Sequence, residues 1–413
     1  MVTGEETESP RGRIYLARSA EEQGLDWIEG VKPHLDRCLG CRACETACPS
    51  GVRYGELLEL AREEIEMRAP HRAKHALLSG MTSPALMKVQ LLLGKLYPGR
   101  RIPKFLSRML SGQAPEADMP RAQSSGIYAP LQESELPAVR GHVLLLEGCV
   151  MRVLFPGVHE ATRRLLRRVG FEVAEVDLGC CGALHAHAGY HSQGLERAHK
   201  LFERAKGLPI IVNSAGCGSF LKDFLLSHEA PPALKAVGPA AAVDETNLAS
   251  AASERGDSAT AVVRSQPLES EAPKVWDISE FLLGQGLADA LASTAGLKHR
   301  VTYHDACHLA HGQGVRKEPR KLLEAIPLLE LVELGESDRC CGSAGIYNLT
   351  QPGLARELLD RKWGFVQESG AEIVVSGNPG CHAWIEQASR EHGGNVRVLH
   401  TAELLEAAFS GLR

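Results

Sequence analysis

One spacing of cysteines occurs twice in the chain, and this repeat constrains the fold more than any other feature. In the first copy, 30 residues separate a Cys from an adjacent Cys-Cys pair, and 35 separate that pair from a last Cys. In the second copy the two intervals are 32 and 39 residues, so matching cysteines lie 158 to 164 positions apart. The two sets are Cys149, Cys180, Cys181 and Cys217, and Cys307, Cys340, Cys341 and Cys381. We interpret the pattern as an internal duplication.

Each copy alternates short apolar runs with amphipathic segments, a pattern typical of parallel α/β layers. We therefore predict two tandem α/β domains, at residues 141–228 and 274–413. Between them, residues 229–273 contain 12 Ala and 5 Pro but no aromatic residue, which predicts a flexible insertion. A helix is expected over VWDISEFLLGQGL, directly after the insertion. The repeated cysteines follow the ends of predicted strands, where parallel sheets bind ligands.

A second cysteine motif lies near the N-terminus. Cys38, Cys41, Cys44 and Cys48-Pro49 form a C-x₂-C-x₂-C-x₃-C-P run, the spacing of a ferredoxin-type [4Fe–4S] site. In two-cluster ferredoxins the fourth Cys of such a run binds the other cluster. Only one run occurs here, so residues 1–66 are expected to form a truncated ferredoxin-type domain with a helix over 52–66.

Twelve cysteines in a 413-residue chain without a signal-peptide pattern favour metal or cluster binding over disulfides. For the repeated sets an Fe–S cluster and a tetrahedral Zn²⁺ both remain open, as does a copy that keeps the fold without a site. The second copy is the better candidate because His304, Asp305 and His308 surround Cys307. The isolated histidines His185, His187 and His191 are expected to be surface or core groups rather than ligands. No G-x-G-x-x-G opens a βαβ unit, so no FAD or NAD site is expected on this chain.

Residues 67–140 are predicted to form a basic helical and linker segment. Between Met67 and Pro115 there are nine Lys or Arg and no Asp or Glu. The segment is either a solvated helical face or, through Arg100, Arg101 and Lys104, a docking surface for an acidic partner or anionic lipid. The net charge of −5 argues against nucleic-acid binding. We expect a cytoplasmic protein, with peripheral attachment to the inner face of the membrane as an alternative.

Taken together, the motifs resemble the iron–sulfur subunit of glycolate oxidase (glycolate dehydrogenase). The resemblance rests on SPRGRIYL, HLDRCLGCRACETACPSGVRYGELL, LEGCV, CCGALHAH, NSAGCGSFLKD, YHDACHL, CCGSAGIYNLTQPGLA and NPGC, and it covers the chain from about Ser9 onward, apart from the insertion. It implies electron transfer from FAD-containing partner subunits, which oxidise glycolate to glyoxylate, toward a membrane-associated or other acceptor. It identifies no catalytic residue on this chain.

The resemblance also implies two ferredoxin-type motifs. Only the second is present, and we expect the first to lie upstream of Met1, the alternative being one cluster on all four cysteines. Heterodisulfide reductase relatives carry a fifth repeat cysteine where this chain has Phe220 and Trp384. The missing fifth cysteines weigh against a heterodisulfide-reductase-like site. The alternative function is nevertheless a lactate-utilisation or heterodisulfide-reductase-like redox protein acting on another 2-hydroxy acid or a disulfide. A zinc-stabilised scaffold without redox activity is a third hypothesis.

Overall fold

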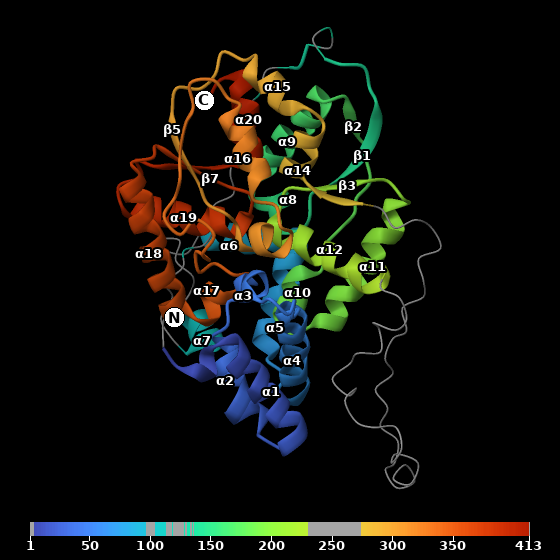
Figure 1. Ribbon diagram of the computed structural model, residues 1–413. Coiled ribbons are helices and arrows are strands. Elements are labelled where there is room, and N and C mark those ends of the chain that lie inside the picture. The colour runs from blue at the N-terminus through green and yellow to red at the C-terminus, as the bar shows by residue number, and fades with distance from the viewer. Residues whose placement is uncertain are drawn as a thin grey trace.

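The computed structural model describes residues 4–95, 104–112, 118, 128, 130–132, 134, 136–229 and 274–412. The N-terminal helices form one end of the molecule, and two β-sheets with their covering helices form the other (Figure 1). The predicted architecture, two parallel α/β repeats preceded by a small helical domain, is confirmed. Apart from Glu229, the predicted insertion lies outside the described residues.

The first sheet has the order β2-β1-β3-β4, and all of its strands are parallel. Its strands are β1 (Gly141–Leu146), β2 (Phe171–Val173), β3 (Ile210–Val212) and β4 (Val275–Asp277). In the central pair, Leu144 lies opposite Ile210 and Leu146 opposite Val212, and these side chains are fully buried or nearly so. Burial on both faces is what the continuous apolar runs predicted.

The second sheet repeats this topology in the order β6-β5-β7-β8. Its strands are β5 (Arg300–Tyr303), β6 (Glu330–Val332), β7 (Ile373–Ser376) and β8 (Arg397–His400). Strand β8 occupies the place that β4 has in the first sheet. The duplication therefore includes four strands per copy. In the first copy the last strand, β4, follows the insertion in the chain.

The segment VWDISEFLLGQGL differs from the expectation of one helix. Its first three residues form β4, which pairs with β3 of the first sheet, and a helix begins only at Ile278. Val275, Trp276 and Asp277 all pair with β3, and Asp277 also caps the helix in a capping box with Glu280. The first sheet thus contains a strand beyond the range 141–228.

Helices cover the sheets and connect the two copies. The first copy contains α8 (Val150–Leu154), α9 (Pro156–Arg168), α10 (Ala183–His187), α11 (His191–Ala205) and α12 (Ala215–Glu229). Then follow α14 (Ile278–Gly284) and α15 (Leu287–Ala292). The second copy contains the π-helical turn η5 (His308–Gly312), α16 (Lys317–Glu324), α17 (Tyr347–Thr350), α18 (Pro352–Ser369), α19 (Pro379–Glu391) and α20 (Thr401–Ser410).

The two copies share one hydrophobic core. Leu165 of α9, Leu405 of α20 and Leu282 of α14 belong to the same buried cluster. At the edge of this cluster, the fully buried carboxylate of Glu406 accepts hydrogen bonds from Arg164 (2.7 Å) and Arg168 (2.9 Å). The copies are therefore packed as one unit, and their cysteine sites are fixed relative to each other.

The N-terminal domain is a small helical bundle. It contains η1 (Glu6–Glu8), α1 (Pro10–Gln23), η2 (Trp27–Val31), α2 (Lys32–Asp36), α3 (Ala43–Ala47) and α4 (Tyr54–Arg68). Trp27, Val31, Leu58 and Ile65 form its buried core. The helix expected over 52–66 corresponds to α4, which begins after the cysteine run.

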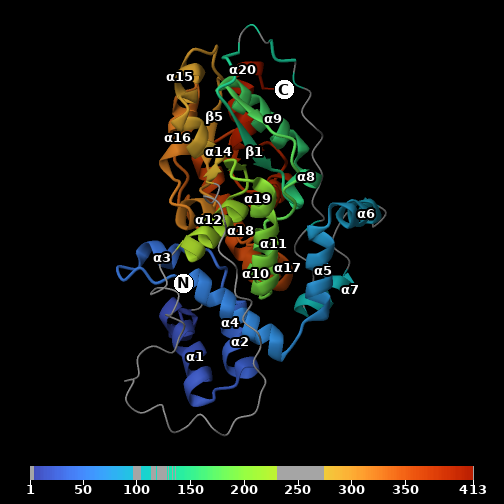
Figure 2. The ribbon, with the colours of Figure 1, turned by 90° about the vertical axis from the view of Figure 1, so that its right-hand side faces the viewer.

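The basic segment contributes α5 (Arg72–Thr82), α6 (Pro84–Lys95) and α7 (Lys104–Ser111). These helices lie together at one side of the molecule (Figure 2). Leu86, Val89 and Leu92 of α6 are exposed. Arg100 and Arg101 lie outside the described residues, so the docking surface stays a prediction. Within the described part of the chain, no helix has the length and apolar character needed to cross a bilayer.

Candidate metal centres

The ferredoxin-type loop runs from α2 to α4, includes the short helix α3, and is tight and partly left-handed before that helix. Gly40 and Arg42 both have φ of 63°, a backbone region that is unfavourable for most side chains. The Cys38 thiol accepts hydrogen bonds from the Gly40 N–H (3.4 Å) and the Tyr54 hydroxyl (3.6 Å). These two donors hold the sulfur of Cys38 in place within the loop.

Three of the four cysteines in this loop form a group. Burial, followed by the charge of Cys307, raises the pKa of Cys41 to about 12. Burial and the thiols of Cys41 and Cys38 likewise raise the pKa of Cys44 to about 11. Cys48 differs, because backbone N–H groups lower its pKa and none of the other thiols contributes. The loop therefore separates Cys48 from Cys38, Cys41 and Cys44.

The loop is attached to the first copy by Arg42. Its guanidinium donates to the Ser219 hydroxyl (2.8 Å) and pairs with Asp223, and both of these residues lie on α12. Glu45 also accepts from Arg42, at 2.9 Å. An Arg in a cysteine loop gives no signal in sequence that its partner lies 181 residues away.

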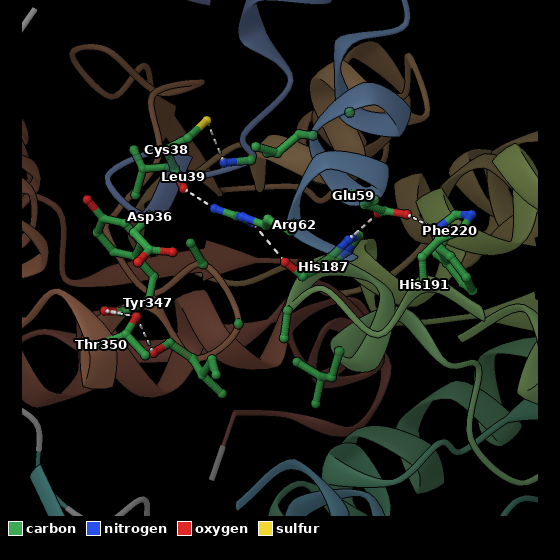
Figure 3. Close-up of a pocket in the computed structure, with 18 of the residues that line it drawn as sticks. Asp36, Cys38, Leu39, Glu59, Arg62, His187, His191, Phe220, Tyr347 and Thr350 are labelled. Atoms are coloured by element: carbon green, nitrogen blue, oxygen red, sulfur yellow. Dashed lines mark hydrogen bonds and ion pairs between the residues drawn. The ribbon is translucent and has the colours of Figure 1, made fainter. Parts of the chain in front are cut away.

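The side chain of a second arginine, Arg62 of α4, binds backbone carbonyls at the start of the loop and in the first copy. It donates to the carbonyl oxygens of Cys38 (2.7 Å), Leu35 (3.0 Å) and His187 (2.8 Å). Figure 3 shows this guanidinium between the loop and α10. Arg62 therefore links the ferredoxin-type loop to the first copy, a role that sequence inspection did not identify.

Arg62 and Cys38 line a cavity of about 580 Å³ between the N-terminal domain and both copies (Figure 3). On one wall, the Glu59 carboxylate lies 2.6 Å from His187 Nδ1 and 2.8 Å from His191 Nδ1. Burial alone would raise the pKa of Glu59, but the hydrogen bonds with the two histidines outweigh it and lower that pKa to about 2. His187 and His191 thus join α4 to the first copy.

The repeated cysteines of the first copy converge at the carboxyl end of the first sheet. Cys149 Sγ lies 3.7 Å from Cys180 Sγ, and Cys181 helps to lower the pKa of both Cys180 and Cys217. Hydrogen bonds with Cys149 and Cys181 lower the pKa of Cys180 to about 3, whereas the one with Cys180 raises the pKa of Cys149. Four thiols in one contiguous group fit a soft metal ion or cluster.

The second copy assembles its cysteines in the same way but buries them more completely. All four are buried, and Cys340 raises the pKa of Cys307, Cys341 that of Cys340, and Cys381 that of Cys341. The polar groups around Cys307 have different partners. Asp305 accepts from Arg320 at 2.8 and 2.7 Å, which makes it an ion-pair residue. His308 Nδ1 lies 3.5 Å from the Cys307 sulfur.

The ferredoxin-type loop lies against the second copy as well. The charges of Cys41 and Cys307 interact, as do those of Cys41 and Cys340, and each interaction raises a thiol pKa. Thr46 Oγ1 lies 3.0 Å from His311 Nδ1 in the π-helical turn η5. The thiols of the ferredoxin-type loop and those of the second copy are therefore neighbours in space.

The donor sets fit the groups that the sequence predicted. Each consists of thiols without disulfide bonds, and thiolates bind both Fe–S clusters and Zn²⁺. Lys362 of α18 is buried beside the second set. Burial lowers its pKa, whereas the thiols of Cys341, Cys340 and Cys381 raise it. An ammonium at this place is a counter-charge for an anionic thiolate site.

Comparison with protein families and known proteins gives a consistent result. Residues 31–54 match the 4Fe-4S binding domain, and residues 143–222 and 301–386 both match the cysteine-rich domain CCG. A probable glycolate oxidase iron-sulfur subunit of Bacillus subtilis is 31% identical over 98% of this chain and 89% of its own length. The glycolate oxidase iron-sulfur subunit of Escherichia coli is 31% identical over 99% and 90%.

Two further similarities are more distant. Lactate utilization protein A of Oceanobacillus iheyensis is 29% identical over 65% of this chain and 98% of its own length. The crystal structure of a hypothetical protein from Helicobacter pylori shares the fold, with a TM-score of 0.55 at 10% identity over 98% of this chain and 67% of that one.

Proposed function

The chain belongs to the family of glycolate oxidase iron–sulfur subunits, and we propose that it is the electron-transfer subunit of a glycolate dehydrogenase complex. In this proposal it receives electrons from FAD-containing partner subunits that oxidise glycolate to glyoxylate. It passes them to an acceptor that another part of the complex or the membrane supplies. The chemistry of substrate oxidation takes place on the partner subunits.

The contact of the ferredoxin-type segment with the second copy, where Thr46 Oγ1 lies 3.0 Å from His311 Nδ1 and Cys307 helps to raise the pKa of Cys41, is the observation that supports this function best. Cys38, Cys41, Cys44 and Cys48 are the proposed ligands of the ferredoxin-type motif. Cys38, Cys41 and Cys44 would bind one cluster, and Cys48 would bind a neighbouring one. Cys307, Cys340, Cys341 and Cys381 are proposed for the second copy, and Cys149, Cys180, Cys181 and Cys217 for the first. A [4Fe–4S] cluster, when bound, supplies one-electron transfer. Adjacent thiol groups would give electrons a short path.

The other residues position these sites and compensate their charge. Arg42 and Arg62 hold the ferredoxin-type loop against the first copy through Asp223 and the His187 carbonyl. Lys362 places a positive charge beside the second-copy thiols. Burial of these thiols excludes water, which limits both hydrolysis and oxidation of a bound cluster. In this proposal the chain is a rigid support for the clusters and provides no catalytic acid or base.

The test compares Cys41→Ser with Ala47→Ser in the complex purified anaerobically with its flavoprotein partners. Ala47 is exposed in the same loop, so the control introduces the same side chain without removing a thiol. We expect glycolate to reduce the flavin equally in both variants. In Cys41→Ser, electron transfer from the flavin to an external acceptor should be at least tenfold slower. Unchanged transfer in a Cys41→Ser complex that has lost the corresponding iron would contradict the proposal.

A further inference from the structure

We propose that His304 is a ligand of the metal centre of the second copy, so that this centre has mixed nitrogen and sulfur donors. The inference rests on the proposed role of the second-copy cysteines as metal ligands, and it adds a residue outside the cysteine pattern. The metal it would bind is a borderline-soft transition ion, namely Zn²⁺ or an iron of an Fe–S cluster, because both accept imidazole beside thiolate.

The geometry of three donors carries the proposal. A ring nitrogen of His304 and the sulfurs of Cys341 and Cys381 all lie within 4.8 Å of one another, and all three residues are buried. Two thiolates on one tetrahedral ion, each about 2.3 Å from it, would be about 3.8 Å apart. The three atoms can therefore reach one ion with small side-chain shifts. In the described part of the chain, this is the one group of three such donors at this spacing.

The position of His304 in the fold directs its ring toward the thiols' end of the sheet. It directly follows β5, and its backbone N–H donates to the Val375 carbonyl of β7 at 2.8 Å. Cys341 follows β6, and Cys381 follows β7. The carboxyl ends of neighbouring parallel strands meet at one edge, so two loops and the first turn of α19, which contains Cys381, supply the three donors.

The ring of His304 also lacks the partners that a buried imidazole normally has. The residue has no exposed surface, and neither of its nitrogens makes a hydrogen bond within ordinary geometry. Burial lowers the pKa of His304, and the backbone of Ser337 raises it but lies outside hydrogen-bond geometry. Buried polar groups are rarely left without a partner. A metal ion would satisfy one nitrogen, and the Ser337 backbone is available to orient the other.

The first copy provides an internal comparison. Three residues before its first cysteine it has Leu146, which is buried among apolar side chains, at the place that His304 holds before Cys307. The neighbouring polar residue, Asp305, is already paired with Arg320. The duplication thus kept the four cysteines in both copies, whereas an imidazole three residues before the first cysteine occurs in the second copy and not in the first.

The test uses the anaerobically purified complex and four variants, one of which, Cys341→Ser, removes a proposed thiolate ligand of the same centre. His304→Leu introduces the residue of the first copy, His304→Cys keeps a metal-binding donor, and His185→Leu removes another buried histidine outside the group of three. Iron and zinc are measured per chain. Nitrogen ligation is measured by X-ray absorption for zinc and by pulsed EPR with ¹⁵N-histidine for iron.

In the unsubstituted complex we expect one histidine nitrogen on a metal, a signal that His185→Leu keeps. His304→Leu should lose this signal and at least half of the metal that Cys341→Ser loses. His304→Cys should lose the signal but retain the metal, which a purely structural histidine would not explain. A nitrogen signal that persists in His304→Cys overturns the inference.

Full metal content in His304→Leu, together with metal loss in Cys341→Ser, overturns the inference that His304 is a ligand. It leaves the proposed electron-transfer function intact. No metal loss in Cys341→Ser overturns the second-copy centre, and this inference with it. The separate test on Cys41 decides the proposed function.

Discussion

Replacement of Arg62 by Met should destabilise the ferredoxin-type loop without removing a ligand. The guanidinium donates to the carbonyls of Cys38 and Leu35 within the N-terminal domain, and to that of His187 in the first copy. A hydrogen bond that involves a charged group contributes about 1.5–3 kcal/mol. At the lower value, loss of the two bonds to the loop costs about 3 kcal/mol, which corresponds to a population of open loop roughly 100-fold higher.

The rate at which a chelator removes iron from the reduced complex measures this opening. We expect release about 100-fold faster in Arg62→Met, and an intermediate rate in Arg62→Lys, since Lys keeps the charge but not the planar fork. Arg18→Met is the control, because Arg18 is exposed and pairs only with Glu22 four residues away. An Arg62→Met rate within twofold of the Arg18→Met rate would refute the reasoning.

Three further predictions concern other parts of the molecule. Glu406→Ala should lower the free energy of unfolding by about 3–5 kcal/mol, since it removes the buried carboxylate that Arg164 binds; a urea midpoint equal to that of the parent chain would exclude this. The pKa of Glu59 is lowered and that of His191 is raised. The stability that Glu59 contributes is therefore lost as the pH falls toward 2, and the stability that His191 contributes is lost as the pH rises above its raised pKa. Amide exchange in α11, corrected for intrinsic rate, should therefore increase from pH 6 to pH 8, and Glu59→Gln should abolish the pH dependence. Cys48→Ser should retain more iron than Cys41→Ser; equal loss would show that the two thiols serve one site.

Much of the fold could be predicted because the strands are buried on both faces. The apolar runs at β1, β3, β5 and β7 and the helices between them were identified by periodicity, and the repeat of cysteines gave their order. The assignment failed at β4, where Val275 and Trp276 continue into a helical pattern. Only pairing with β3 across the insertion decides that these residues form a strand.

The candidate sites were predictable to a similar extent. Cysteine spacing identified all twelve thiols, since ligand spacing within a loop is a local property of the chain. Spacing did not reveal that Arg42 binds Asp223, that Glu59 joins His187 and His191, or that Asp305 is taken by Arg320. These partners, Asp305 and Arg320 excepted, are more than 100 residues apart, and charged residues give no local signal of the partner they will contact.

The sequence by itself determined the family, the duplicated parallel α/β architecture and the types of donor, because periodicity and cysteine spacing are properties of contiguous segments. Only the tertiary structure decided which donors meet. It brought Cys41 to the thiols of the second copy, separated Cys48 from its own motif, and placed His304 beside Cys341 and Cys381. The physical reason is that the carboxyl ends of parallel strands, far apart in the chain, converge at one edge of a sheet.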